Sequence, residues 1–152
     1  MKKDILFVRE VKMTYLDNPN PPESLRRAEK FHGVEEAAKF VQSILAGETQ
    51  ECFVVICLNA QNKPIAYRIV TRGTLTCSLV HPREVFQTAI ATLAAGIIVS
   101  HNHPGGNPEP SGEDISITHQ LAEAGKIIGI NLLDHIIVTE DRYTSFLERG
   151  LL

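Results

Sequence analysis

The sequence has few cysteines, and they do not follow the pattern of a disulfide framework. Its 152 residues include three, Cys52, Cys57 and Cys77, an odd number without a Cys-x-x-Cys spacing. Small disulfide-stabilised secreted domains usually carry an even number of cysteines at short spacings. We therefore expect buried, reduced thiols in a cytoplasmic protein.

Long apolar runs are also absent. No segment approaches the roughly 20 apolar residues that a membrane-spanning helix requires. Near the amino terminus, the apolar run Ile5-Leu6-Phe7-Val8 is cut short by a charge at Arg9, which makes it a poor signal peptide. The sequence predicts a protein without a membrane segment.

There is no large excess of charge of one sign, since the net charge is -3 and the isoelectric point is about 6.1. Dedicated nucleic-acid-binding proteins usually carry a basic stripe. The nearest equivalent here, Arg26, Arg27 and Lys30, is flanked by Glu23 and Glu29. Strong direct DNA binding by this chain alone is therefore not expected. A small basic patch that contacts nucleic acid stays an alternative.

The rest of the composition is that of an ordinary globular domain, with 43% hydrophobic and 22% charged residues and no internal repeats. Apolar spacing and turn residues predict helices over 34–45, 82–95 and 111–128, and strands over 5–16, 51–58, 64–71, 96–103, 130–133, 135–138 and 143–146. Gly96 is expected to cap the second helix. This order predicts a mixed sheet with packed helices, of the α/β or α+β class, with residues 1–33 forming an N-terminal strand and connector before a domain over 34–152.

The most informative segment follows the apolar run over residues 96–99, which is typical of a buried strand. His101 and His103 are two residues apart, so in a strand both side chains point the same way. After a loop rich in proline and glycine, Ser111-x-x-Asp114 brings back a carboxylate. Two imidazoles and one carboxylate leave the fourth position of a tetrahedral zinc ion open, as in catalytic rather than structural zinc sites.

Two simpler interpretations compete with a metal site. Ser111 and Asp114 also match a capping box at a helix start. That interpretation is compatible with a metal site, because a capped first turn would hold Asp114 rigidly beside the histidines. Alternatively, the histidines surround a buried polar site without metal, but unpaired imidazoles beside a carboxylate cost free energy to bury.

The motif His101-x-His103-Pro104 followed by Ser111-x-x-Asp114 resembles the JAMM signature of the JAB/MPN metalloprotease superfamily. Further motifs resemble its RadC-like branch: Arg72-Gly73-Thr74-Leu75, His81-Pro82-Arg83-Glu84-Val85, Asp134-His135-Ile136-Ile137-Val138 and the ending from Ser145-Phe146 to Gly150-Leu151-Leu152. The resemblance implies a single JAB/MPN domain, whose cytidine-deaminase-like mixed sheet is flanked by helices. Longer RadC-type proteins carry an N-terminal helix-hairpin-helix domain. We expect a short stand-alone form here, of the kind found among mobile and prophage-associated genes.

The resemblance also implies a zinc-dependent hydrolase that cleaves peptide or isopeptide bonds in a protein or peptide substrate. Zinc would be held by His101, His103 and Asp114. The family pattern places the general base at Glu51, which opens an apolar strand. Ser111 would donate a hydrogen bond to the oxyanion of the tetrahedral intermediate.

A second hypothesis is a non-catalytic zinc-binding module that acts through a partner in DNA repair, DNA replication or mobile-element biology. The oligomeric state is open, since the strand over 5–16 could join its own sheet or that of a second copy. Among the other histidines, we expect His81 to serve helix entry or packing, His135 to orient a zinc ligand or to be structural, and His119 to lie on the surface.

Overall fold

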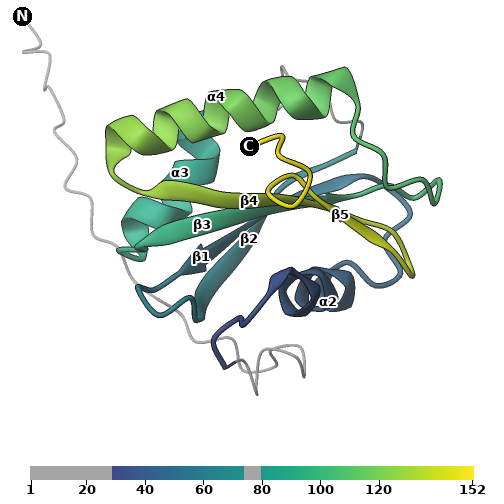
Figure 1. The fold of residues 1–152 in the computed structure, drawn as a ribbon, viewed down its shortest axis with the longest axis horizontal. Coiled ribbons are helices and arrows are strands. Elements are labelled where there is room, and N and C mark those ends of the chain that lie inside the picture. Colours follow the sequence, from purple (N-terminus) through teal and green to yellow (C-terminus); the bar gives the residue numbers. More distant parts are fainter. Residues whose placement is uncertain (1–28, 74–79) are drawn as a thin grey trace, which may run out of the picture.

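The computed structural model describes residues 29–73 and 80–152, which form a five-stranded sheet with helices on both faces (Figure 1). In chain order the elements are α2 Val34–Ile44, β1 Cys52–Leu58, β2 Pro64–Arg72, α3 Pro82–Ala91, β3 Gly96–Asn102, α4 Gly112–Ile128, β4 Asn131–Val138 and β5 Tyr143–Ser145. No helix within these two ranges is both long and apolar enough to cross a membrane.

The strand order in the sheet is β2-β1-β3-β4-β5. Strands β3 and β4 run parallel because α4 crosses over between them, whereas β1–β2, β1–β3 and β4–β5 are antiparallel. Every residue of β1 and β3 is buried. The predicted mixed sheet flanked by helices, in the α/β or α+β class, is confirmed.

The two faces of the sheet are covered by different helices. Helices α3 and α4 lie over one face and α2 lies over the other (Figure 1). Alternate residues of β1 follow this division: Phe53 and Val55 join the core beneath α3 and α4, whereas Val54 and Ile56 join the core beneath α2. The same alternation in β3 sends Val99, and then His101, toward α4.

The predicted helix over residues 82–95 is too long, because α3 ends at Ala91. The hydroxyl of Thr92 donates to the carbonyl of Thr88 at 2.9 Å, and Leu93 adopts a left-handed φ of 53°, which helical geometry does not allow. Gly96 is not the helix cap that we predicted. It opens β3, where an added Cβ would lie 3.0 Å from a Leu133 methyl group.

The predicted strands over 130–133 and 135–138 are one continuous strand, β4, with an irregular register between Ile97 and Ile98 of its neighbour β3. The predicted strand over 5–16 and the third cysteine, Cys77, lie outside the described residues. Cys52 and Cys57 are buried and free of disulfide bonds, as expected. The domain boundary between residues 33 and 34 stays a prediction.

Gly125 allows α4 to pack closely on the start of β4. A Cβ at this position would lie 2.5 Å from the carbonyl oxygen of Ile130 and 3.2 Å from the Phe86 ring. We expect Gly125→Ala to lower the free energy of unfolding by about 1–3 kcal/mol, measured by chemical denaturation. Gly112→Ala is the matched control, because no atom lies within 4 Å of its Cβ position. Equal stability of the two variants would contradict the close approach.

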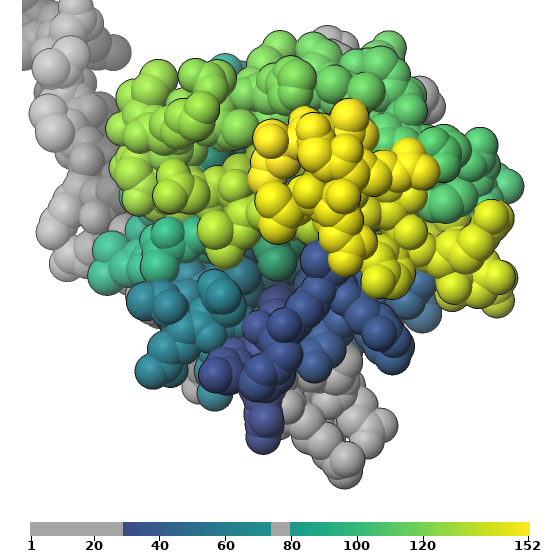
Figure 2. All heavy atoms as spheres, viewed as in Figure 1, coloured from purple at the N-terminus to yellow at the C-terminus, as the bar shows by residue number. Residues whose placement is uncertain are grey.

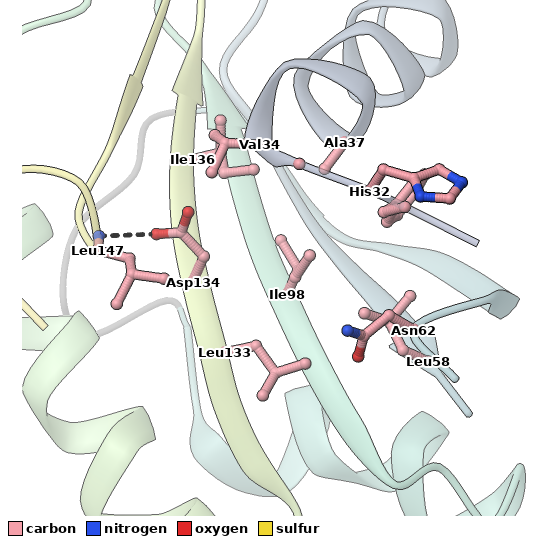
Figure 3. Close-up of a pocket in the computed structure, with 12 residues that line it drawn as sticks. His32, Val34, Ala37, Leu58, Asn62, Ile98, Leu133, Asp134, Ile136 and Leu147 are labelled. Carbon is pink, nitrogen blue, oxygen red and sulfur yellow. Dashed lines mark hydrogen bonds between the residues drawn. The ribbon is translucent and has the colours of Figure 1, made fainter. Parts of the chain in front are cut away.

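The C-terminal segment is held against the sheet by a buried carboxylate. Asp134 of β4 accepts hydrogen bonds from the backbone N–H groups of His135 at 2.8 Å and Leu147 at 2.9 Å, and from the Ser145 hydroxyl at 2.5 Å. Asp134 and Leu147 border a cavity of about 180 Å³ beside the start of α2 (Figure 3). In the space-filling view the C-terminal segment lies between α4 and α2 (Figure 2).

Ionisation of Asp134 is expected to lower the free energy of unfolding relative to the neutral side chain. Burial raises its pKa, although the three hydrogen bonds lower it in part. The folded chain therefore binds this proton more tightly than the unfolded chain, whose Asp pKa is about 3.9. The contribution of Asp134 to the free energy of unfolding should therefore fall as the pH rises through the raised pKa of the folded state. In Asp134→Asn this part of the pH dependence should disappear, as measured by denaturation at several pH values between about 4 and 7. An unchanged pH profile would contradict this role.

Candidate metal centre

Two histidines project from the carboxyl end of the central strand β3. His101 pairs with Phe53 of β1 and is almost fully buried, with 1% of its surface exposed. The backbone N–H of His103 donates to the carbonyl of Val138 at 2.9 Å, which continues the pairing with β4. The extended backbone therefore directs both rings to the same side, and their Nε2 atoms lie 2.9 Å apart.

Asp114 comes from the first turn of α4, where a capping box fixes it. The Ser111 hydroxyl accepts a hydrogen bond from the Asp114 N–H at 3.1 Å, and the Ser111 N–H donates to Asp114 Oδ2 at 2.8 Å. Asp114 Oδ1 lies 3.2 Å from His101 Nε2, and Oδ2 lies 3.6 Å from His103 Nε2. The capping box and the proximity to the histidines coexist, as the sequence suggested.

The three side chains can hold a metal ion. One donor atom from each of His101, His103 and Asp114 lies within 4.8 Å of the other two. The other ring nitrogen of His103, Nδ1, lies 2.7 Å from the carbonyl oxygen of Asn107, so Nδ1 carries the proton in the neutral ring. Its Nε2 then presents a lone pair toward the other two donors, which is the arrangement that a metal ligand requires.

The charges in this cluster favour a cation. Burial raises the pKa of Asp114, but the His101 and His103 rings, which donate hydrogen bonds to the carboxylate when protonated, outweigh burial and hold that pKa well below its usual range. Asp114 in turn raises the pKa of His103, because the carboxylate accepts a hydrogen bond from the protonated ring. The carboxylate therefore stays ionised, and a divalent cation could take the place of the proton that the metal-free cluster attracts.

Glu51, the predicted general base, lies at the same edge of the sheet. It is half-buried and immediately precedes β1. The antiparallel register pairs Phe53 with His101, so extending it by two residues places Glu51 opposite His103. The charge of Glu51 also contributes, after the larger effect of Asp114, to the raised pKa of His103. The structure thus brings Glu51 near the histidines, while its catalytic role stays a prediction.

Asn102, which the sequence analysis did not single out, holds the backbone on both sides of Glu51. Its Oδ1 accepts a hydrogen bond from the Cys52 N–H at 2.7 Å, and its Nδ2 donates to the Gln50 carbonyl at 3.0 Å. The sequence offered one indication of this role: Asn102 lies between the two candidate ligands His101 and His103, so in a strand its side chain points to the opposite face. The amide ties the strand that carries the histidines to the one that follows Glu51.

The remaining histidines of the described ranges lie outside the three-donor cluster. His135 is fully buried beside His101, and burial lowers its pKa well below the usual value, while its orienting or structural role stays a prediction. His81 precedes α3 at the N-cap position, in line with helix entry, but its side chain makes no capping hydrogen bond. His119 is exposed, as predicted, and so is His32.

A cleft of about 690 Å³ reaches the candidate metal centre at His103, whereas His101 and Asp114 do not line it. Its walls come from the turn over residues 45–49, the loop from Asn102 to Gly106, and the connection between β4 and β5. His103 lines this cleft, so a molecule bound there would contact one of the candidate ligands. Clefts of this size are typical of ligand-binding sites.

A mixed sheet whose central strand supplies two histidines, followed by a helix whose capped first turn supplies an aspartate, defines a JAB-type domain with a candidate metal centre. The chain belongs to the RadC-like JAB domain family, whose model matches residues 31–151. The family expected from the sequence motifs is therefore confirmed.

Several curated relatives are identical to this chain at about half of the aligned positions. A UPF0758 protein of Methanospirillum hungatei is 56% identical over 108 residues, covering 71% of this chain and 48% of that protein. A UPF0758 protein of Symbiobacterium thermophilum is 54% identical over 114 residues, covering 75% and 49%. One from a Geobacillus species is 49% identical over 116 residues, covering 76% and 51%. The chain thus spans about half the length of these relatives.

Proposed function

We propose that this domain is a zinc-dependent hydrolase that cleaves peptide or isopeptide bonds. The observation that carries the proposal is the convergence of His101 Nε2, His103 Nε2 and an Asp114 carboxylate oxygen within 4.8 Å of one another. Three protein donors leave the fourth tetrahedral position available, which distinguishes catalytic from structural zinc sites. When bound, zinc would supply Lewis acidity and lower the pKa of a water molecule to about 7.

Glu51 supplies the proton transfer in this proposal. Its carboxylate accepts a proton from the attacking water and delivers it to the nitrogen of the leaving amine as the C–N bond breaks. The Asn102 contacts with Cys52 and Gln50 restrict the backbone around Glu51 and so limit its movement relative to His103. Positioning of this kind contributes to catalysis because the conformational freedom of the catalytic group is already lost before the reaction begins.

Ser111 is the proposed donor to the developing oxyanion. Its hydroxyl oxygen accepts from the Asp114 N–H, which uses a lone pair and leaves the hydroxyl proton for a substrate oxygen. Because Ser111 is exposed and sits at the start of α4, a substrate carbonyl could reach it. The positive end of the helix dipole would add to the stabilisation of negative charge there.

Part of the protein or peptide substrate would lie in the cleft that His103 lines, and its scissile bond would lie beyond the cleft, near Glu51 and Ser111. A small-molecule amide would leave most of the cleft of about 690 Å³ unused.

The test is hydrolysis by purified, zinc-loaded protein of a broad panel of peptides and isopeptide-linked lysine conjugates. We expect cleavage that a chelator abolishes and that added zinc restores. Inactivity of fully zinc-loaded protein on the whole panel would contradict the proposal.

The second candidate is a zinc-binding interaction module without catalysis, with partners in DNA repair, DNA replication or mobile-element biology. All three candidate ligands and Glu51 are present together, which favours the hydrolase. Partner or DNA binding that persists unchanged in a His101→Ala, His103→Ala double variant, together with an inert zinc-loaded protein, would favour the module. The net charge of -3 gives little support to strong direct DNA binding.

A further inference from the structure

A buried chain of hydrogen bonds leads away from the candidate metal centre. His101 Nδ1 lies 2.8 Å from His135 Nε2, and His135 Nδ1 lies 2.6 Å from the hydroxyl oxygen of Thr118 on α4. That hydroxyl lies 2.5 Å from the backbone carbonyl oxygen of Asp114. All three side chains are buried, with Thr118 and His135 at 0% and His101 at 1% exposure.

The positions of the protons follow from the last contact in this chain. A carbonyl oxygen has no hydrogen, so at 2.5 Å the Thr118 hydroxyl must donate to Asp114. Its only hydrogen is then used, and the hydroxyl oxygen faces His135 Nδ1 as an acceptor. His135 Nδ1 therefore carries a proton, and in the neutral ring Nε2 has only a lone pair.

The proton position on His135 in turn fixes the proton position on the candidate ligand His101. Because His135 Nε2 accepts, His101 Nδ1 must be the donor in the contact at 2.8 Å. Neutral His101 then has no proton on Nε2, the nitrogen 3.2 Å from Asp114 Oδ1. Ring packing keeps this geometry in place, since Phe53 stacks on His101 at 6.1 Å between centroids and Phe146 stacks on His135 at 4.6 Å.

We propose that His135 and Thr118 are positioning residues that hold His101 as the Nδ1–H tautomer, so that its Nε2 lone pair faces the cation site. The hydrogen bonds form an open chain: His101 from β3 donates to His135 from β4, His135 donates to Thr118 from α4, and Thr118 donates to the backbone carbonyl of Asp114. One network thereby links the His101 ring to the turn of α4 that carries Asp114. This inference rests on the proposed function, because it assigns the network to the same metal centre.

The first test is the tautomeric state itself, read from long-range ¹H–¹⁵N NMR spectra of the imidazole rings. In the zinc-free protein we expect His135 to carry its proton on Nδ1, with Nε2 unprotonated. In the protein loaded with Zn²⁺ alone we expect His101 to carry its proton on Nδ1. A proton on His135 Nε2 would overturn the proposal whether or not the protein binds zinc.

The second test is the affinity for Zn²⁺, measured by competition with a chromophoric chelator. His135→Leu removes the acceptor and should weaken binding about 10- to 100-fold, the usual effect of losing a partner of a metal-bound histidine. His135→Gln retains an acceptor oxygen and should restore most of the affinity. If His135→Leu does not fold, Thr118→Val supplies the measurement, with an expected loss of about tenfold and rescue by Thr118→Ser.

His119→Leu is the control for these variants. His119 also lies on α4, but it is exposed and its contact is with the carbonyl of Leu151. Its substitution should leave zinc affinity unchanged. Wild-type affinity in both His135→Leu and Thr118→Val would overturn the positioning role, whereas a wild-type protein that binds no zinc would contradict the proposed metal centre instead.

Discussion

Glu51→Gln is expected to reduce hydrolysis by the zinc-loaded domain about 10²- to 10⁴-fold while zinc stays bound. General acid–base groups contribute about this factor, and glutamine cannot accept the proton of the attacking water. The side chain does not belong to the three-donor cluster, so the substitution should leave zinc stoichiometry and affinity near those of wild type. The measurement is kcat/KM on any substrate found in the peptide panel, with zinc content determined on the same samples.

The control for this substitution is Glu123→Gln. Glu123 is an exposed carboxylate on α4 that pairs with Lys126 at 2.7 Å, and it has no part in the site. Its substitution removes the same charge without touching the β1 edge, so activity should be unchanged. Full activity of Glu51→Gln would show that another group transfers the proton.

The second large effect is expected from removal of a candidate ligand. His101→Ala and Asp114→Asn should each weaken Zn²⁺ binding by more than about 100-fold, because loss of a direct ligand exceeds the effect of losing an outer partner. Asparagine at position 114 keeps an oxygen for the hydrogen bond from the Ser111 N–H, so the helix cap is preserved. Zinc content by plasma mass spectrometry and chelator competition measure the effect.

Thermal unfolding gives an independent check on the same variants. Free Zn²⁺ at about 100 times its Kd should stabilise the wild type by about 2.7 kcal/mol, and the variants by far less. Retention of one tightly bound zinc ion per chain in both variants would mean that the metal is held elsewhere. That result would also remove the basis of the proposed hydrolase.

Much of the fold was predictable because its signals are local. The helix over 34–45 and the hairpin of β1 and β2 follow from apolar spacing and a turn at Asn62, which adopts a left-handed φ of 59°. The end of α3 was not predictable in this way. The residues after Ala91 include alanines that favour helix, but Ala94 and Ala95 donate to the carbonyls of Ala89 and Leu58, and the second of these contacts depends on the assembled sheet.

Some residues of the candidate site were likewise predictable from local sequence, and one was not. His101, His103, Ser111 and Asp114 lie within a short segment, so strand periodicity and helix capping place them together without knowledge of the remaining chain. Glu51 could be selected among several acidic residues only by its match to the family pattern. Its nearness to His103 depends on the pairing of β1 with β3, which joins segments about 50 residues apart.

The sequence by itself determined the family, the sheet-and-helix order and the three candidate ligands, because these depend on residue types at short fixed spacings. Only the tertiary structure decided which groups contact those ligands. Thr118, His135 and Asn102 meet their partners through contacts between β1, β3, β4 and α4, and no local pattern specifies such contacts. Proton positions in the network are likewise a tertiary property, since the protonated nitrogen of each imidazole is set by the partner that packing brings to it.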